Sequence, residues 1–170
     1  MKNVLSLFLL CSISLGCDNG PSSDAPKTGA DGSKSAPSTA KQGELGPVVD
    51  AYDGVRAALA NDDLAAATSA AKALESAAKA ASLNALASSA EALGKVGTDD
   101  ADALRLAFGH VSEALIAKLA DDDALRGSLH VFECPMAKGF GKWVQRDKEL
   151  KNPYMGKAML TCGSESEWKS

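Results

Sequence analysis

Sulfur-containing side chains are concentrated in the last quarter of this 170-residue chain. Residues 130–136 read HVFECPM, and residues 152–163 read NPYMGKAMLTCG. The two segments together contain one histidine, two cysteines and three methionines, which are His130, Cys134, Met136, Met155, Met159 and Cys162. Thiolates and thioethers are soft, polarisable ligands that match Cu(I) or Ag(I) better than magnesium or calcium. We therefore predict that these residues form a site for a soft monovalent metal ion.

The spacing within residues 152–163 predicts how part of this site is assembled. An Asn-Pro pair opens the segment and a glycine closes it, and these are typical start and stop signals of a short helix. On such a helix Met155, Met159 and Cys162 stand at positions i, i+4 and i+7 and share one face. That face would carry two thioethers and a thiol.

The first cysteine, Cys134, lies in a segment with signals for irregular structure. Pro135 ends any strand or helix that runs through residues 130–134, and two glycines interrupt the chain before Trp143. Cys134 and Met136 are two residues apart, so they would project together from a locally extended chain. An irregular loop of this kind can fold its sulfur atoms around a small ion.

The amino-terminal residues predict export and a lipid anchor. Lys2 precedes an apolar run over residues 4–13, and Gly16 stands directly before Cys17, which is the order of a bacterial lipoprotein signal peptide. The run is shorter than the about 20 residues that a membrane-spanning helix needs. We expect residues 1–16 to be the signal peptide and Cys17 to anchor the protein to a membrane in the periplasm or cell envelope. An ordinary cleaved signal is the alternative, and it also exports the chain.

The composition after Cys17 indicates a linker followed by one domain. Residues 17–46 are rich in small and polar residues and hold almost no large apolar side chain, so they cannot bury enough surface to offset their conformational entropy. Residues 47–163 have the typical length of one domain, and residues 164–170 form a tail. The net charge of −4 argues against a nucleic-acid partner, which requires a basic face.

Apolar residues recur at helical spacing through most of the domain, and no alternating strand pattern competes with them. We expect helices to begin near Pro47, Asn61 and Thr98, with no strong breaker at residues 80–82 between the second and the third. This pattern predicts an all-α fold: an up-and-down helical bundle of about four helices, with an irregular C-terminal segment that contains the Cys/Met residues and ends in a short helix. The four apolar stripes are Val48, Tyr52, Val55 and Leu59; Leu64, Ala67, Ala71, Leu74 and Ala78; Leu83, Leu86, Ala90 and Leu93; and Leu104, Phe108, Val111, Leu115 and Leu119.

Two alternatives to a metal site use the same cysteines. In an oxidising compartment, a disulfide between Cys134 and Cys162 would close a loop of about 28 residues and stabilise the domain by ~3.5 kcal/mol in the chain-entropy model. Met136 and Met159 would then be core residues, and the other alternative is a redox switch between thiols and disulfide. All three interpretations require the two cysteines to lie close together. We expect no enzymatic activity, because no oxyanion or orienting group is identifiable for a cysteine nucleophile with His130 as its base.

The order of short motifs in the chain resembles a known family. The motifs are CPMA at residues 134–137, GKW at 141–143, NPY at 152–154 and ML-x-CG at 159–163, preceded by NDDLAAA at 61–67 and SEALI at 112–116. They resemble a bacterial domain of unknown function that occurs alone or fused to the periplasmic adaptor subunits of heavy-metal efflux pumps. The resemblance covers about residues 48–163 and implies copper or silver handling, with an efflux adaptor as partner and Cys134, Met136, Met159 and Cys162 as the matching ligands.

From the residues and the resemblance together we expect an exported lipoprotein that binds Cu(I) or Ag(I) as an accessory or buffer to metal efflux. The alternative is a disulfide-stapled helical interaction module of the cell envelope that binds no metal. Binding of a soft ion by the reduced chain separates these two hypotheses.

Overall fold

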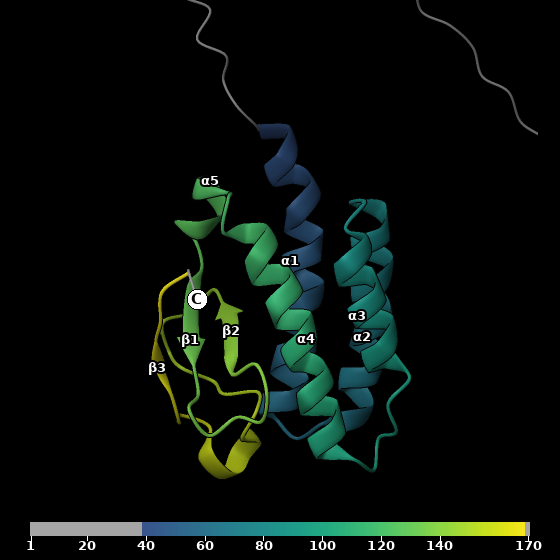
Figure 1. The fold of residues 1–170 in the computed structure, drawn as a ribbon, viewed down its shortest axis with the longest axis vertical. Coiled ribbons are helices and arrows are strands. Elements are labelled where there is room, and N and C mark those ends of the chain that lie inside the picture. The colour runs from purple at the N-terminus through teal and green to yellow at the C-terminus, as the bar shows by residue number, and fades with distance from the viewer. Residues whose placement is uncertain (1–38, 169–170) are drawn as a thin grey trace, which may run out of the picture. The chain divides into compact units, whose positions relative to one another are not determined.

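The computed structural model describes residues 39–168, which lie within the unit Ala36–Ser170. The predicted signal peptide, Cys17 and the predicted linker up to residue 38 lie outside the described residues. Figure 1 shows the long helices side by side, with a small sheet next to them. In chain order the described elements are α1 (Thr39–Ala60), α2 (Leu64–Ala80), α3 (Asn84–Gly94), α4 (Ala101–Leu119), α5 (Asp123–Arg126), β1 (His130–Glu133), β2 (Lys142–Gln145), the 3-10 helix η1 (Gly156–Met159) and β3 (Ser164–Glu165).

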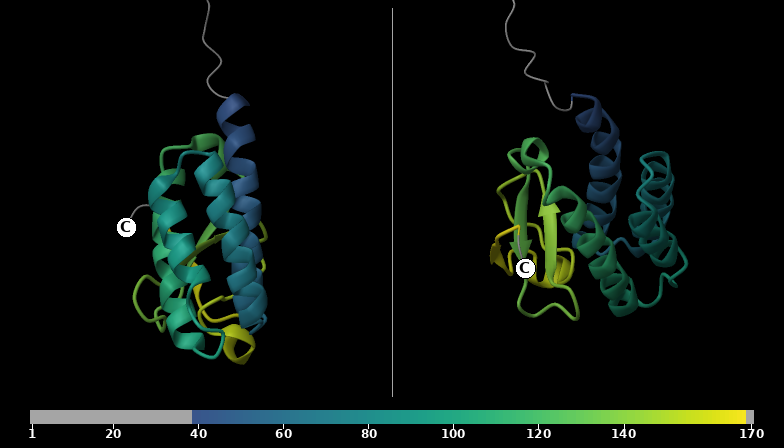
Figure 2. Two further views of the ribbon diagram at one scale, coloured as in Figure 1. Left: turned by 90° about the vertical axis from the view of Figure 1, so that its right-hand side faces the viewer. Right: turned by 45° about the horizontal axis from the view of Figure 1, so that its top comes forward.

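Helices α1 to α4 form a bundle that buries the predicted apolar stripes. Each helix packs on the next one in sequence, α1 on α2, α2 on α3 and α3 on α4, and Figure 2 shows them side by side from two further directions. Leu64 and Leu83 are half-buried, whereas the other large residues of the stripes are buried, with Leu59, Leu74 and Leu115 fully so. Ala67 and Ala71 are also fully buried, and their small side chains let α2 approach its neighbours closely. The helical bundle expected from the sequence is therefore confirmed.

Helix α1 begins at Thr39, well before the predicted start near Pro47, so the last residues of the predicted linker are helical. Pro47 lies inside the helix, where it removes one backbone hydrogen bond. Leu45 is only 6% exposed, and Val48 and Val49 are buried beside it. Apolar burial thus holds this part of α1 on the domain in spite of the proline. Helix α1 therefore includes residues that composition assigned to the linker.

The other helix boundaries follow from side-chain caps and turns. Asp63 caps α2 and Asp100 caps α4, and each carboxylate accepts a backbone N–H of the first turn at 2.9 Å. Helices α2 and α3 are separate, because Ser82 adopts a φ of 58° in the turn between them. Between residues 39 and 168 there is no helix with the length and apolar character needed to cross a bilayer.

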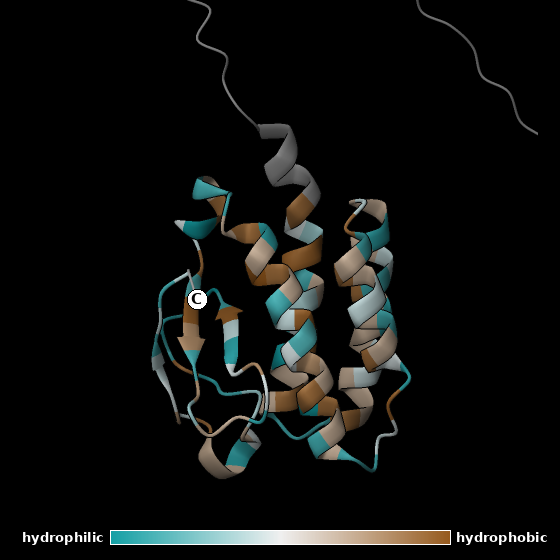
Figure 3. Cartoon of the chain, viewed as in Figure 1, coloured by the Kyte–Doolittle hydropathy of each residue, from teal (hydrophilic) through white to brown (hydrophobic). Residues whose placement is uncertain are grey.

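The prediction of an all-α fold is wrong, because the chain after the bundle forms a three-stranded antiparallel sheet. The strand order is β2-β1-β3, and β1 pairs Val131 with Val144 and Phe132 with Trp143 of β2. Adjacent residues are buried in both strands, so neither shows the alternation of apolar and polar residues that marks a half-exposed strand. Figure 3 shows the apolar residues on these strands as well as on the helices. The described part of the chain is a mixed helix-and-sheet fold.

Buried aromatic residues join the sheet to the bundle. The Tyr52 hydroxyl on α1 accepts a hydrogen bond from the Val144 N–H at 3.3 Å and lies 2.7 Å from Ser112 Oγ on α4. Trp143 of β2 is fully buried and packs edge-on against Tyr154, with ring centroids 5.9 Å apart. The hydroxyl of Tyr52 therefore connects α1, α4 and β2.

Candidate functional site

Three sulfur atoms from two loops meet beside the sheet. The Sγ atoms of Cys134 and Cys162 lie 3.7 Å apart, and the Met136 Sδ lies 4.0 Å from Cys162 Sγ. Both cysteines are free thiols, since a disulfide bond requires about 2.05 Å between its sulfurs. Cys134 is buried, Cys162 is half-buried and Met136 is 57% exposed, so this sulfur cluster opens to solvent on the methionine side. The proximity of the two cysteines that all three sequence interpretations required is present.

A tight turn after β1 positions the first two sulfurs. The Ala137 N–H donates to the Cys134 carbonyl at 3.2 Å and closes a β-turn with Pro135 at its second position and Met136 at its third. The Cys134 N–H donates to the Gly141 carbonyl at 3.0 Å, which ties the turn to the chain entering β2. A Cβ atom on Gly141 would lie 2.6 Å from the Cys134 carbonyl oxygen, so this approach requires glycine. The Cys-Pro-Met-Ala motif is thus a turn that directs Met136 back toward the cysteines.

The third sulfur lies on a loop that differs from the prediction. The expected helix over residues 152–163, with Met155, Met159 and Cys162 on one face, does not form, and only the short helix η1 is present. Gly156 adopts a φ of 58°, which prevents a continuous α-helix from passing through it. Cys162 lies beyond η1, in a turn closed by its N–H donating to the Met159 carbonyl at 3.0 Å.

Asn152 and Gly163 hold this second loop in place. Asn152 is fully buried, and its Nδ2 donates to the Cys162 carbonyl at 2.5 Å. Its Oδ1 accepts from the N–H groups of Tyr154 and Met155, and its own N–H donates to the Leu160 carbonyl. Gly163 has a φ of 133°, and a Cβ there would lie 2.7 Å from the carbonyl oxygen of residue 133 in β1. The sequence indicated Asn152 only as a helix cap and gave no sign of its bond to Cys162.

The remaining predicted ligands lie outside the sulfur cluster. Met159 is 40% exposed, and the sulfur–sulfur contacts found among the described residues join Cys134, Cys162 and Met136. Met155 is half-buried and packs against the core. Met136 and Met159 are both exposed, so neither is the core residue that the disulfide alternative assumed. The structure therefore brings together three of the six predicted ligands.

His130 stands at the opposite end of β1 from Cys134, about 13 Å away along an extended strand. Its Nδ1 lies 3.1 Å from a carboxylate oxygen of Glu165 in β3. The pair borders an open cavity of ≈ 730 Å³ that is also lined by Arg126 and Trp168. His130 is therefore separate from the thiols, both as a ligand and as a base for a cysteine nucleophile.

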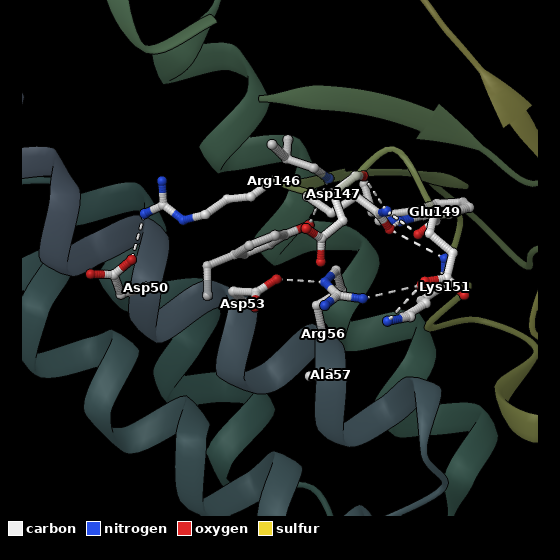
Figure 4. Close-up of polar contacts among 12 residues, drawn as sticks. Asp50, Asp53, Arg56, Ala57, Arg146, Asp147, Glu149 and Lys151 are labelled. Atoms are coloured by element: carbon white, nitrogen blue, oxygen red, sulfur yellow. Dashed lines mark hydrogen bonds and ion pairs between the residues drawn. The ribbon is translucent and has the colours of Figure 1, made fainter. Parts of the chain in front are cut away.

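The chain before Asn152 is fixed to helix α1 by a buried arginine. Figure 4 shows Arg56 between Asp53 on its own helix and Lys151 on the loop after β2. Arg56 is 6% exposed, and its guanidinium donates to the Asp53 carboxylate at 2.6 Å and to the Lys151 carbonyl at 3.3 Å. The buried Gln145 side chain donates to two further carbonyls of the same loop. This loop is therefore anchored before it reaches the asparagine that holds Cys162.

The electrostatics of the cluster come from the thiols themselves. Hydrogen bonding to the Cys134 thiol raises the pKa of the Cys162 thiol above its ordinary value, and partial desolvation adds to this. The Cys162 thiol is therefore protonated at neutral pH and must lose its proton to become a metal ligand. Within residues 39–168 no set of three or more His, Cys, Asp or Glu side chains is placed to hold a metal ion, so the third donor at this cluster is a thioether.

Comparison with models of known families, with curated proteins and with solved structures finds no match to this chain. The resemblance carried by the Cys-Pro-Met-Ala and Asn-Pro-Tyr motifs therefore stays a prediction.

Proposed function

We propose that this protein binds a soft monovalent ion, Cu(I) or Ag(I), through Cys134, Cys162 and Met136, and that it serves metal efflux as an accessory or buffer. The observation that carries the proposal is the third sulfur. A disulfide needs two cysteines and nothing else, whereas this cluster adds a thioether 4.0 Å from one thiol. Three soft donors in one place match the ligand preference of Cu(I) and Ag(I).

The separations of the sulfurs suit an ion between them. With metal–sulfur bonds of about 2.3 Å, as in zinc–thiolate sites, three ligands in a trigonal plane stand about 4.0 Å from one another. The two measured separations, 3.7 Å and 4.0 Å, are close to this value. A disulfide would instead require the cysteine sulfurs to approach each other to about 2.05 Å. The cluster as it stands is therefore closer to an ion-binding arrangement than to a covalent bond.

The exposure of Met136 supports the same conclusion. Met136 is 57% exposed at the tip of its turn, so its thioether can be reached by an ion from solvent. An exposed thioether can swing onto an arriving ion, while the buried Cys134 supplies a fixed anchor. The location in the cell envelope and the role in efflux are supported by the lipoprotein-type amino terminus and by the motif resemblance. The alternative function, a disulfide-stapled interaction module, is favoured only by the proximity of the two thiols.

Native mass spectrometry with Ag(I) tests the proposal. The full chain should carry Cys11→Ser and Cys17→Ser, so that Cys134 and Cys162 are its only thiols, and it should be kept reduced. We expect about one Ag(I) per chain, with an apparent affinity that rises with pH because the ion displaces the Cys162 proton. Failure of the reduced chain to bind Ag(I) would reject the metal function and leave the interaction module.

Two methionine variants supply a matched comparison. Met136→Leu should weaken Ag(I) binding by about tenfold or more, a loss that removing a supporting group of a metal site already causes. Met159→Leu is the control, since Met159 is also exposed but its sulfur lies outside the cluster. Leucine has nearly the volume of methionine, so both variants should fold. Equal affinities in the two variants would remove Met136 from the site.

A further inference from the structure

We propose that Asn152 is the positioning residue of the sulfur cluster: its buried amide holds the Cys162 thiol beside Cys134. This inference rests on the proposed function only in taking the thiol pair as the working part of the site. Asn152 is fully buried, and its Nδ2 donates to the Cys162 carbonyl at 2.5 Å. Its backbone N–H donates to the Leu160 carbonyl at 2.7 Å. One residue thus closes the loop that carries the second thiol.

Both polar atoms of the Asn152 side-chain amide form hydrogen bonds, Oδ1 as acceptor and Nδ2 as donor. Its Oδ1 accepts the N–H of Tyr154 at 2.7 Å and the N–H of Met155 at 3.1 Å, which orients the amide so that Nδ2 faces Cys162. Only a side chain with a paired acceptor and donor can make both sets of bonds at once. A buried amide with its partners in place also has no low-energy alternative orientation. The Asn152 side chain therefore fixes the Cys162 backbone rather than following it.

The two thiols depend on Asn152 to different degrees. Cys134 directly follows β1 and is held by bonds to Gly141 and Ala137, none of which involves Asn152. Cys162 follows a short 3-10 helix, and its own backbone bonds are those to Met159 and Asn152. Loss of the Asn152 amide should therefore move one thiol away from the other and leave the first in place.

The test measures how closely the thiols are held, without any metal. The reduced full chain with Cys11→Ser and Cys17→Ser is equilibrated with oxidised and reduced glutathione and quenched with acid. Mass spectrometry then gives the fractions of the dithiol and disulfide forms. One cysteine thiolate attacks oxidised glutathione and releases one glutathione, and the other attacks the mixed disulfide and releases the second. Two electrons pass from the dithiol to glutathione, and the two thiol protons end on the two glutathione thiols. The equilibrium constant is the effective concentration of one cysteine at the other.

Asn152→Asp and Asn152→Ala are compared at pH 8. A carboxylate that accepts the two N–H groups is ionised at that pH, so the aspartate keeps both acceptor bonds but turns an oxygen toward the Cys162 carbonyl. We expect both variants to lower the effective concentration by about tenfold or more, the change in an equilibrium constant expected when a buried hydrogen-bond partner is lost. Circular dichroism verifies that each variant is folded during the measurement.

Tyr52→Phe is the control for a general loss of stability. It removes the buried hydroxyl that joins α1, α4 and β2, whose hydrogen-bond partners are Ser112 and Val144 and neither cysteine, and it should leave the glutathione equilibrium unchanged. If the folded Asn152 variants have the same glutathione equilibrium constant as the wild-type chain, the proposal is overturned. If neither Asn152 variant folds, the residue supports the whole domain and the proposal is also overturned. A wild-type chain with closely held thiols that fails to bind Ag(I) would reject the metal function alone.

Discussion

Replacing Gly163 with alanine should destabilise the protein and separate the cysteines at the same time. Gly163 has a φ of 133°, a conformation that costs a residue with a side chain about 1–3 kcal/mol. Its added Cβ would lie 2.7 Å from the carbonyl oxygen of residue 133 and 3.1 Å from the Trp143 ring. Relieving such overpacking typically costs a further 1–3 kcal/mol, while the stiffer unfolded chain returns up to about 1 kcal/mol. The expected net loss of unfolding free energy is about 3 kcal/mol.

Urea unfolding of the reduced chain measures this loss through the fluorescence of the buried Trp143. Gly54→Ala is the matched control, because Gly54 lies in α1 and a Cβ there would meet only the Ala70 side chain, in ordinary contact at 3.7 Å. That control should raise the unfolding free energy by about 0.5–1 kcal/mol, the ordinary gain from alanine in a helix. The glutathione equilibrium of Gly163→Ala should also shift, since residue 163 must move away from β1 and takes Cys162 with it. A Gly163→Ala variant within about 0.5 kcal/mol of wild type would refute the close approach on which the second loop depends.

Two further predictions concern the bundle. Leu45→Ala should lower the unfolding free energy by about 2 kcal/mol, because Leu45 is only 6% exposed although composition assigns it to the linker. An unchanged midpoint of urea unfolding would mean that Leu45 does not pack on the domain and that residues 39–46 belong to the linker. Tyr52 and Tyr154 are the only tyrosines of the chain, and burial raises the pKa of both hydroxyls. The protonated hydroxyls therefore stabilise the folded protein fully below about pH 10. This stability is lost as the pH rises toward the folded-state pKa values. Tyrosinate absorbance should therefore appear together with alkaline unfolding followed by circular dichroism, and a native protein whose tyrosines titrate near pH 10 would contradict their burial.

The helices could be predicted because their burial repeats along the chain. Residues such as Phe108 and Leu115 recur at helical spacing over a long segment, and each repeat supports the next. The start of α1 could not be placed, because Leu45 is a single apolar residue among polar ones and Pro47 is a typical first residue of a helix. Its burial depends on contacts with the rest of the bundle, which local composition does not report.

The sheet could not be predicted for a different physical reason. Strands β1 and β2 are four residues long and bury adjacent residues, such as Val131 with Phe132 and Trp143 with Val144. Such runs lack the period of two that identifies a strand, and their pairing is between segments separated by a turn. The sequence predicted the meeting of the two cysteines, but not the atoms that hold them.

The two exposed candidate ligands, Met136 and Met159, also differ from what local sequence patterns predict. Met136 was expected to project with Cys134 from an extended chain, whereas a β-turn at Pro135 and Met136 instead places the Met136 sulfur 4.0 Å from that of Cys162. Met159 was expected on a helix face with Cys162, but Gly156 interrupts that helix with a φ of 58°. A glycine in the middle of an expected short helix was the signal available in the sequence, and it outweighs the cap residues before it.

The loop that leads to Cys162 lies at one end of the domain. Helix α1 starts at Thr39, and just beyond its other end the Asp62 carboxylate accepts a hydrogen bond from the Lys157 N–H of η1 at 3.0 Å. Figure 1 shows the yellow segment that contains η1 far from the start of α1. A helix of 22 residues is about 33 Å long, so the loop leading to Cys162 lies at the end of the domain opposite to the entry of the chain. The chain enters the described part of the protein at Thr39, at the opposite end of α1 from η1. The metal site that we propose is therefore reached by a loop that is remote from the point of entry of the chain.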